Sequence, residues 1–97
     1  MDVKSMNNEV PKEISNMAKS HNLEITIRVG KDGITESLLS ELIAQLKRRD
    51  LVKVKANKGI ISNRENRKEI FSQIAHRAGS TVVFQRGNIA VFWRTSL

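Results

Sequence analysis

The sequence predicts a single α/β domain in which helices and strands follow the order αβαβαββ. Three observations support this fold class. Residues 24–56 contain a strand-like stretch, a helix-like stretch and a second strand-like stretch, the succession of a βαβ unit. A helical pattern precedes this unit, and a further helix followed by two β-rich runs comes after it. The chain has 97 residues, enough for one hydrophobic core but not for two.

Charge and residue usage limit the classes of function. The 17 Lys and Arg against 10 Asp and Glu give a formal net charge of +7, which favours a polyanion such as nucleic acid over a small acidic substrate. The chain has no cysteine and 2 histidines, so we expect no disulfide, no metal and no cofactor. The longest apolar run, residues 89–93, is far shorter than a membrane span. We therefore expect a soluble, cytoplasmic protein.

The first helix is predicted just after a polar tail. Residues 1–9 show little apolar patterning, and we expect them to be flexible, ahead of a domain at residues 10–97. Pro11 suits a first helical turn. We expect the helix to end near His21 and Asn22. Its apolar face would be Val10, Ile14, Met17 and Ala18.

The βαβ unit is built from two alternating stretches and a helix. Residues 24–29 alternate between apolar and polar side chains, and residues 51–55 do the same, which predicts two half-buried parallel strands. The helix between them has Thr35 as its N-cap and Glu36 in its first turn, both favourable at a helix N-terminus. Its apolar residues recur at helical spacing: Ile34, Leu38, Leu39, Leu42, Ile43 and Leu46.

Two glycines separate the first strand from this helix, in the loop Gly30-Lys31-Asp32-Gly33. Glycine lets a ligand approach the backbone closely, and the amides of the next helical turn, with Lys31 beside them, favour an anion such as phosphate. The bare motif is more often a turn that needs a positive φ than a binding loop. The spacing excludes a Walker loop, and a dinucleotide fingerprint would need a third glycine.

A third helix is predicted after residue 60. Ser62 and Glu65 form a capping box at its start, and Gly79 ends it in the left-handed conformation. We expect its buried face to be Ile70, Phe71, Ile74, Ala75 and Ala78. Its outer face is a weaker candidate for nucleic-acid contact and carries Arg64, Arg67, Lys68 and Arg77.

A β-hairpin is predicted at the end of the chain. Residues 81–86 and 89–94 are two β-rich runs, joined by Gly87-Asn88 in a type II′ turn. Trp93 alternates with Ile89 and Val91, which predicts packing in the core rather than a platform for stacking bases.

Cationic side chains could converge near the glycine loop. If the two strands of the βαβ unit are parallel neighbours, the loop lies at the carboxyl edge of the sheet, where ligands usually bind. The polar alternates Arg28, Lys53 and Lys55 would project from the face opposite the apolar alternates. Arg86 in the hairpin is a fourth candidate. An alternative is that the lysines are solvent-exposed on the sheet face and bind no ligand.

Together these segments resemble the CRM domain, the family of chloroplast RNA splicing and ribosome maturation proteins that includes the small bacterial YhbY-type proteins. The resemblance covers nearly the whole chain after the tail. Residues 29–36, Val-Gly-Lys-Asp-Gly-Ile-Thr-Glu, are similar to the Gly-x-x-Gly segment of the family. Residues 49–55 are similar to its Glu-Leu-Ile-Lys-Val-Lys strand, and Gly79 and the closing Val91-Phe92-Trp93-Arg94 also match.

The resemblance implies a four-stranded mixed sheet packed with three helices, similar to the C-terminal domain of bacterial translation initiation factor three. It implies non-catalytic binding of ribosomal or precursor RNA, or of pre-ribosomal particles, in ribosome assembly or RNA maturation. We expect a monomer that does not bind membranes. Asp50 replaces the Glu of the family, and Asp32 places a negative charge in the loop. The RNA-contacting residues carried over are Gly30, Lys31, Asp32 and Gly33, and the basic neighbours are Arg28, Lys53, Lys55 and Arg86.

Several alternatives remain open. A KH domain has a similar Ile-x-x-Gly-x-x-Gly signature, here at residues 27–34, but its loop joins two helices, so a strand at residues 24–29 would argue against it. A protein-protein adaptor on ribosomal particles would keep its partner after ribonuclease treatment and in moderate salt. A DNA binder would need a recognition helix. An enzyme would need a convergent set of catalytic groups, and the sequence shows none.

Overall fold

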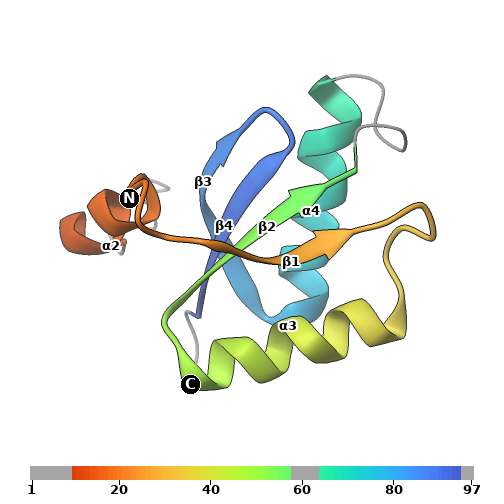
Figure 1. Cartoon of the computed structure of the whole chain (residues 1–97), viewed down its shortest axis with the longest axis horizontal. Helices are drawn as coiled ribbons and strands as arrows, with labels where there is room; N and C mark the ends of the chain where they lie inside the picture. The colour runs from red at the N-terminus through yellow and green to blue at the C-terminus, as the bar shows by residue number, and fades with distance from the viewer. Residues whose placement is uncertain (1–9, 58–63, 95–97) are drawn as a thin grey trace, which may run out of the picture.

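The structure is a computed structural model that describes residues 10–57 and 64–94 (Figure 1). These residues form three helices and four strands in the predicted order αβαβαββ. The tail at residues 1–9, Ser62 and the side chains of Arg64 and Glu65 lie outside the described residues. The elements are α2 (Lys12–Ala18), β1 (Ile25–Val29), α3 (Glu36–Arg48), β2 (Leu51–Ala56), α4 (Arg64–Ala78), β3 (Ser80–Arg86) and β4 (Ile89–Arg94).

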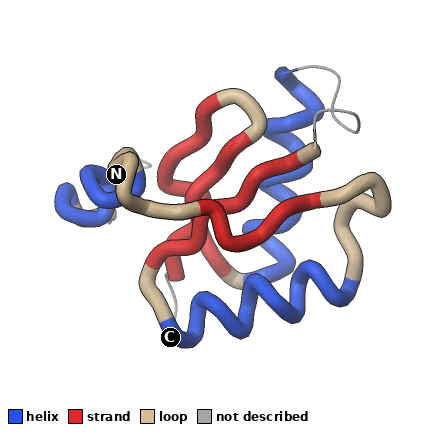
Figure 2. The backbone as a smooth tube through the Cα atoms, viewed as in Figure 1, coloured by secondary structure: helices blue, strands red, loops and turns tan. Residues whose placement is uncertain are grey.

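The four strands form one mixed sheet in the order β1-β2-β4-β3. β1 and β2 are parallel, whereas β4 is antiparallel to both β2 and β3. The parallel pair confirms the predicted βαβ unit, and the sheet confirms the predicted fold class. Figure 2 shows the loop after β1 leading directly into α3, so the glycine loop lies where β1 ends and α3 begins.

The main core lies between the sheet and the helices α3 and α4. Phe71 of α4 and Phe92 of β4 meet edge to face there, with ring centroids 6.2 Å apart, a preferred arrangement for aromatic pairs. The predicted inner face of α4 is confirmed, because Phe71, Ile74 and Ala75 are buried. The other buried members of this core are Ile27, Val29, Leu42, Leu46, Val52, Val54, Ala56 and Ala90.

A smaller apolar cluster joins α2 to the opposite face of the sheet. Ala18 of α2 is buried against Leu51 and Val91, and Trp93 packs against the same cluster, as its alternation predicts. In Figure 1, α2 lies at the side of the sheet where β1 begins, away from the tips of β1 and β2. Within the described residues, this helix therefore covers one end of its face and leaves the other end open.

The structure corrects the predicted end of the first helix. α2 ends at Ala18, so the expected end near His21 and Asn22 is too late. Ser20 explains the difference, because its hydroxyl accepts the Asn22 amide at 3.0 Å and its carbonyl accepts the Leu23 amide at 3.3 Å. A continuing helix would need these amides for its own ladder.

Two apolar side chains assigned to buried helix faces are exposed instead. Met17 is 52% exposed because α2 reaches the sheet through Ile14 and Ala18, one turn apart. Ile43 is 36% exposed, and Gln45 takes a buried position on α3. The Gln45 Oε1 accepts a hydrogen bond of 2.6 Å from the Thr26 hydroxyl, and its Nε2 donates to Glu41 at 2.9 Å. These partners satisfy the buried amide and link α3 to β1.

Candidate functional site

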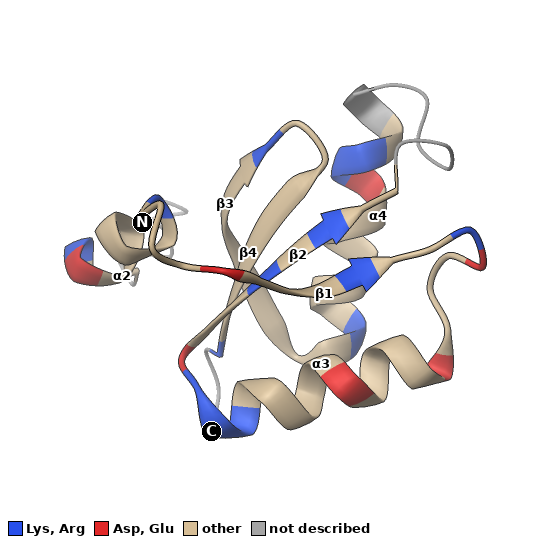
Figure 3. Cartoon of the chain, in the orientation of Figure 1, with Lys and Arg blue, Asp and Glu red and all other residues tan. Residues whose placement is uncertain are grey.

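The glycine loop is a tight turn whose two glycines have different roles. The Gly33 amide donates to the Gly30 carbonyl at 2.9 Å, which leaves Lys31 and Asp32 exposed at the tip of the turn (Figure 3). Gly33 has φ +72°, so the backbone itself requires glycine there. Gly30 has no positive φ, and a Cβ on it would meet no heavy atom of the described chain within 4 Å. The conformation of the turn therefore explains why glycine is needed at Gly33, but it does not explain the glycine at Gly30.

The helix side of the loop has mixed charge. Thr35 is the N-cap of α3, as predicted, because its hydroxyl accepts the Leu38 amide at 3.0 Å. This hydrogen bond occupies one of the first-turn amides that an anion would otherwise use. A hollow of about 390 Å³ lies between the loop and α3, and its charged lining residues are Arg28, Lys31, Asp32 and Glu41. These carboxylates make this side less favourable to phosphate than the motif alone predicts.

The sheet side of the loop carries cations without carboxylates. A hollow of about 510 Å³ lies beside Gly30, at the ends of β1 and β2, and no Asp or Glu of the described ranges lines it. Its lining residues are Arg28, Val29, Gly30, Lys55, Ala56, Asn57 and Asn88. Two cations, open glycine backbone and amide side chains are a suitable set of groups for an anion.

Strand register places the cations of this hollow next to each other. Arg28 pairs with Lys55, and Lys55 pairs in turn with Ile89, the partner of Arg86. Arg28, Lys55 and Arg86 therefore form one row across all four strands, which we call the cationic row (Figure 3). Since adjacent strands lie about 4.8 Å apart, the backbones at the two ends of the row are separated by roughly 14 Å.

Asn88 holds the hairpin against the end of β2. Its Nδ2 donates to the Ala56 carbonyl at 2.7 Å, and the Ala56 amide donates to the Asn88 carbonyl at 2.7 Å. Gly87 has φ +62°, which the first position of a primed hairpin turn requires. The sequence predicts only the turn role of Asn88. Its contact with Ala56 could not be predicted, because the two residues are 32 positions apart and leave no local signal.

Lys53 does not belong to the cationic row. Its Nζ donates to the Leu23 carbonyl at 3.1 Å, so the half-buried side chain ties β2 to the segment that enters β1. Ile25 pairs with Lys53, and the register shifts before Ile27. Of the basic candidates from sequence, Arg28 and Lys55 are therefore adjacent, Arg86 lies farther along the same row, and Lys53 has a structural contact elsewhere.

The opposite end of the sheet pairs a cation with an acid. The Arg94 guanidinium lies 3.4 Å from the Asp50 carboxylate and also donates to the Lys47 carbonyl at 3.4 Å. The Arg94 amide donates to the Asp50 carbonyl at 3.2 Å. Asp50, one of the two residues that depart from the family pattern, thus joins the segment at residues 49–55 to the closing segment at residues 91–94.

The described residues provide neither a cluster of metal ligands nor a membrane-spanning helix. Among residues 10–57 and 64–94, no three His, Asp or Glu side chains gather as metal ligands. No helix in these ranges is long and apolar enough to cross a membrane. The segment before the glycine loop is the strand β1, so the loop does not join two helices as it does in a KH domain.

Comparison with known proteins agrees with this fold. The family model of the CRS1/YhbY (CRM) domain matches residues 10–94. A protein of Methanocaldococcus jannaschii named "probable RNA-binding protein" is 36% identical over 77 residues, and the match covers 79% of this chain. The match covers 56% of that relative, so this chain spans little more than half of the relative's length.

The solution structure of a hypothetical protein from Staphylococcus aureus has a TM-score of 0.71 with 24% identity and 91% coverage of each chain, which shows a shared fold. The chain belongs to the CRS1/YhbY (CRM) domain family.

Proposed function

We propose that this protein binds RNA without catalysing a reaction, and that it grips the RNA backbone beside Gly30 with Arg28 and Lys55. The observation that carries the proposal is the pairing of these two cations in a hollow that no described carboxylate lines. Membership of the CRM family and the name of the Methanocaldococcus relative support RNA as the polyanion. The net charge of +7 supplies a general attraction for it.

The aromatic residues of the chain favour recognition of the backbone over stacking of bases. The chain has 3 Phe, 1 Trp and no Tyr. Phe71 and Phe92 lie in the main core, and Phe84 and Trp93 pack in the cluster under α2. Proteins that bind unstacked single strands usually offer exposed aromatic side chains to the bases. Binding through phosphates positions an RNA without reading its sequence, which suits a role on ribosomal or precursor RNA during ribosome assembly or RNA maturation.

Lys31 contributes to this site in a secondary way. It stands at the exposed tip of the loop, where it can reach a phosphate that lies over Gly30. Its neighbour Asp32 is equally exposed and opposes the attraction. We therefore assign the larger share of the affinity to Arg28 and Lys55, with Arg86 extending the row.

The test is a binding titration across a salt series with a structured RNA and with DNA of the same sequence. Arg28→Gln and Lys55→Gln are compared with Lys19→Gln, which removes an exposed cation from the far end of the molecule. Each site variant should lower RNA affinity and make the log-log salt dependence shallower by about 0.7 to 0.9 for each phosphate that the variant no longer neutralises. The control should bind like the unmodified protein, and the RNA should be recovered intact.

Two results would overturn the proposal. If all three variants bind alike, the affinity comes from a generic basic surface rather than from the hollow beside Gly30. If the protein stays on ribosomal particles after ribonuclease treatment and in moderate salt, its partner is a protein and the adaptor hypothesis takes over.

A further inference from the structure

A second hollow that no described carboxylate lines lies on the other side of the β3–β4 hairpin. It has a volume of about 520 Å³ and is lined by Arg67 and Lys68 of α4 and by Gln85 and Gly87 of the hairpin. Gln85 pairs with Ala90, a residue of the main core. This hollow therefore opens on the face of the sheet that carries α4, whereas the cationic row lies on the opposite face.

Arg67 is held in this hollow without a full set of protein partners. Its side chain is half-buried, and its Nε is buried with no hydrogen-bond partner among the described residues. A buried guanidinium nitrogen without an acceptor is costly in a folded protein, and such groups call for an explanation. Because the side chain as a whole is only half-buried, an anion at the mouth of the hollow can contact its exposed part, although the buried Nε itself lies out of reach.

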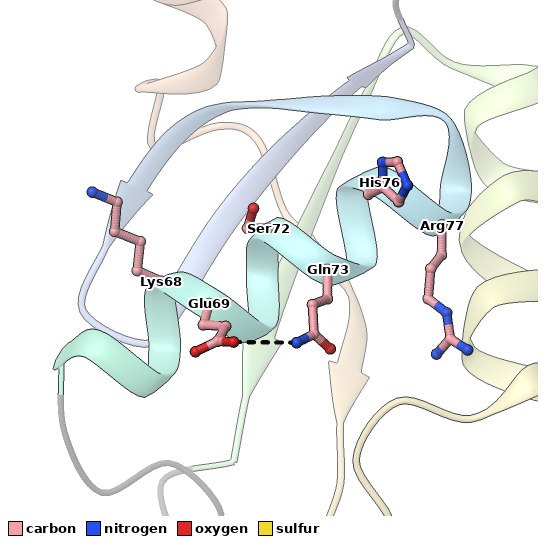
Figure 4. A pocket seen from close by; sticks show the side chains of 6 residues that line it. All are labelled: Lys68, Glu69, Ser72, Gln73, His76 and Arg77. Atoms are coloured by element: carbon pink, nitrogen blue, oxygen red, sulfur yellow. Dashed lines mark hydrogen bonds between the residues drawn. The ribbon is translucent and has the colours of Figure 1, made fainter.

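Lys68 lies beside Arg67 and is exposed. Figure 4 shows its side chain extending from the outer face of α4 towards the end of β3. Glu69 and Lys68 line one hollow on the outer face of α4, where the Glu69 carboxylate accepts a hydrogen bond of 3.5 Å from Gln73 (Figure 4). Lys68 also lines the hollow beside the hairpin whereas Glu69 does not, so no described carboxylate shares that second hollow with the lysine.

We propose that Arg67 and Lys68 form a second phosphate-contact site, so that the hairpin stands between two segments of the backbone of one folded RNA. This inference rests on the proposed function and adds two contact residues to it. Arg86 belongs to the cationic row and directly precedes Gly87, which lines the second hollow. Because the hollows open on opposite faces of the sheet, an RNA that occupies both must bend around the hairpin or present the two strands of a groove.

The experiment measures the binding of an RNA hairpin across a salt series to Arg67→Gln, Lys68→Gln and Lys55→Gln. The matched controls are Arg48→Gln and Lys19→Gln, exposed cations at the other end of the molecule. Arg67→Gln and Lys68→Gln should each weaken binding several-fold and reduce the salt slope by about 0.7 to 0.9. Lys68 is exposed, so its substitution tests the site even if Arg67→Gln fails to fold by circular dichroism.

The outcomes separate this inference from the proposed function. If Lys55→Gln weakens binding and the two α4 variants behave like the controls, the second site is wrong and the proposed function stands. If Lys55→Gln also binds RNA like the controls, the proposed function itself is wrong. With an unpaired RNA of equal length, the α4 variants should lose less affinity than with the hairpin, and equal losses would contradict a folded ligand.

Discussion

Arg28 on β1 and Lys55 on β2 are register partners, so two like charges lie side by side on adjacent strands. Like charges placed directly opposite each other destabilise a sheet, and no described carboxylate lines the hollow that they share. A phosphate bound between them, as proposed above, would relieve the repulsion and stabilise the folded state, because it would bind that state alone. The pair therefore predicts opposite effects of one substitution on stability and on binding.

The first prediction is that Lys55→Gln stabilises the free protein while it weakens RNA binding. Removing the repulsion should raise the free energy of unfolding by about 0.2 to 1 kcal/mol in low salt, and the gain should shrink as salt screens the pair. Urea denaturation at two salt concentrations measures it, with Lys19→Gln as the control. A loss of stability that does not depend on salt would mean that packing of the half-buried lysine stem outweighs the repulsion.

The second prediction separates the two glycines of the loop. Gly30→Ala should leave the fold intact and stabilise it by about 0.4 to 1 kcal/mol, because alanine restricts the unfolded chain and meets open space in the folded one. RNA affinity should nevertheless fall, since the new methyl group would stand where the RNA backbone approaches in the proposed complex.

Gly33→Ala is the matched control for the loop. At φ +72°, alanine costs about 1 to 2 kcal/mol, so thermal unfolding should distinguish the two variants. If Gly30→Ala binds RNA as tightly as the unmodified protein, the ligand does not approach the backbone at this residue.

The elements of the fold could be predicted because their signals are local. Alternation marks β1 and β2, Thr35 caps α3, and Gly79 ends α4 with φ +65°. Each of these features depends on residues within a few positions of each other, which one sequence displays directly.

The candidate site depends on pairings that are not local. Lys53 and Lys55 look equivalent in an alternating strand, yet Lys53 reaches the Leu23 carbonyl whereas Lys55 stands beside Arg28. The register of β1 against β2 decides between these positions, and the sequence carries no local mark of it. The hollow behind the hairpin is hidden for the same reason, because it joins Arg67 to Gln85 across 18 positions of the chain.

The burial of Gln45 could not be predicted from helical periodicity, because that pattern counts apolar residues alone.

The third prediction concerns the hydrogen bonds of Gln45. Thr26→Val removes the donor to the Gln45 Oε1 and should lower the free energy of unfolding by about 1 kcal/mol. Urea denaturation measures the loss. Combining it with Gln45→Met removes both polar partners, so the double variant should recover part of the stability, and an additive loss would show that the two side chains are not coupled.

The last prediction concerns Asn88, which joins the hairpin to β2. Asn88→Ala removes the donor to the carbonyl of buried Ala56 and should cost about 1 to 3 kcal/mol in urea denaturation. Asn88→Asp also loses that donor, and it places a carboxylate in the hollow that Arg28 and Lys55 line. Under conditions where both variants are folded, Asn88→Asp should therefore bind RNA more weakly than Asn88→Ala, with the difference shrinking as salt is added. Equal binding by the two variants would mean that no phosphate enters this hollow, because a new negative charge there would repel a bound anion.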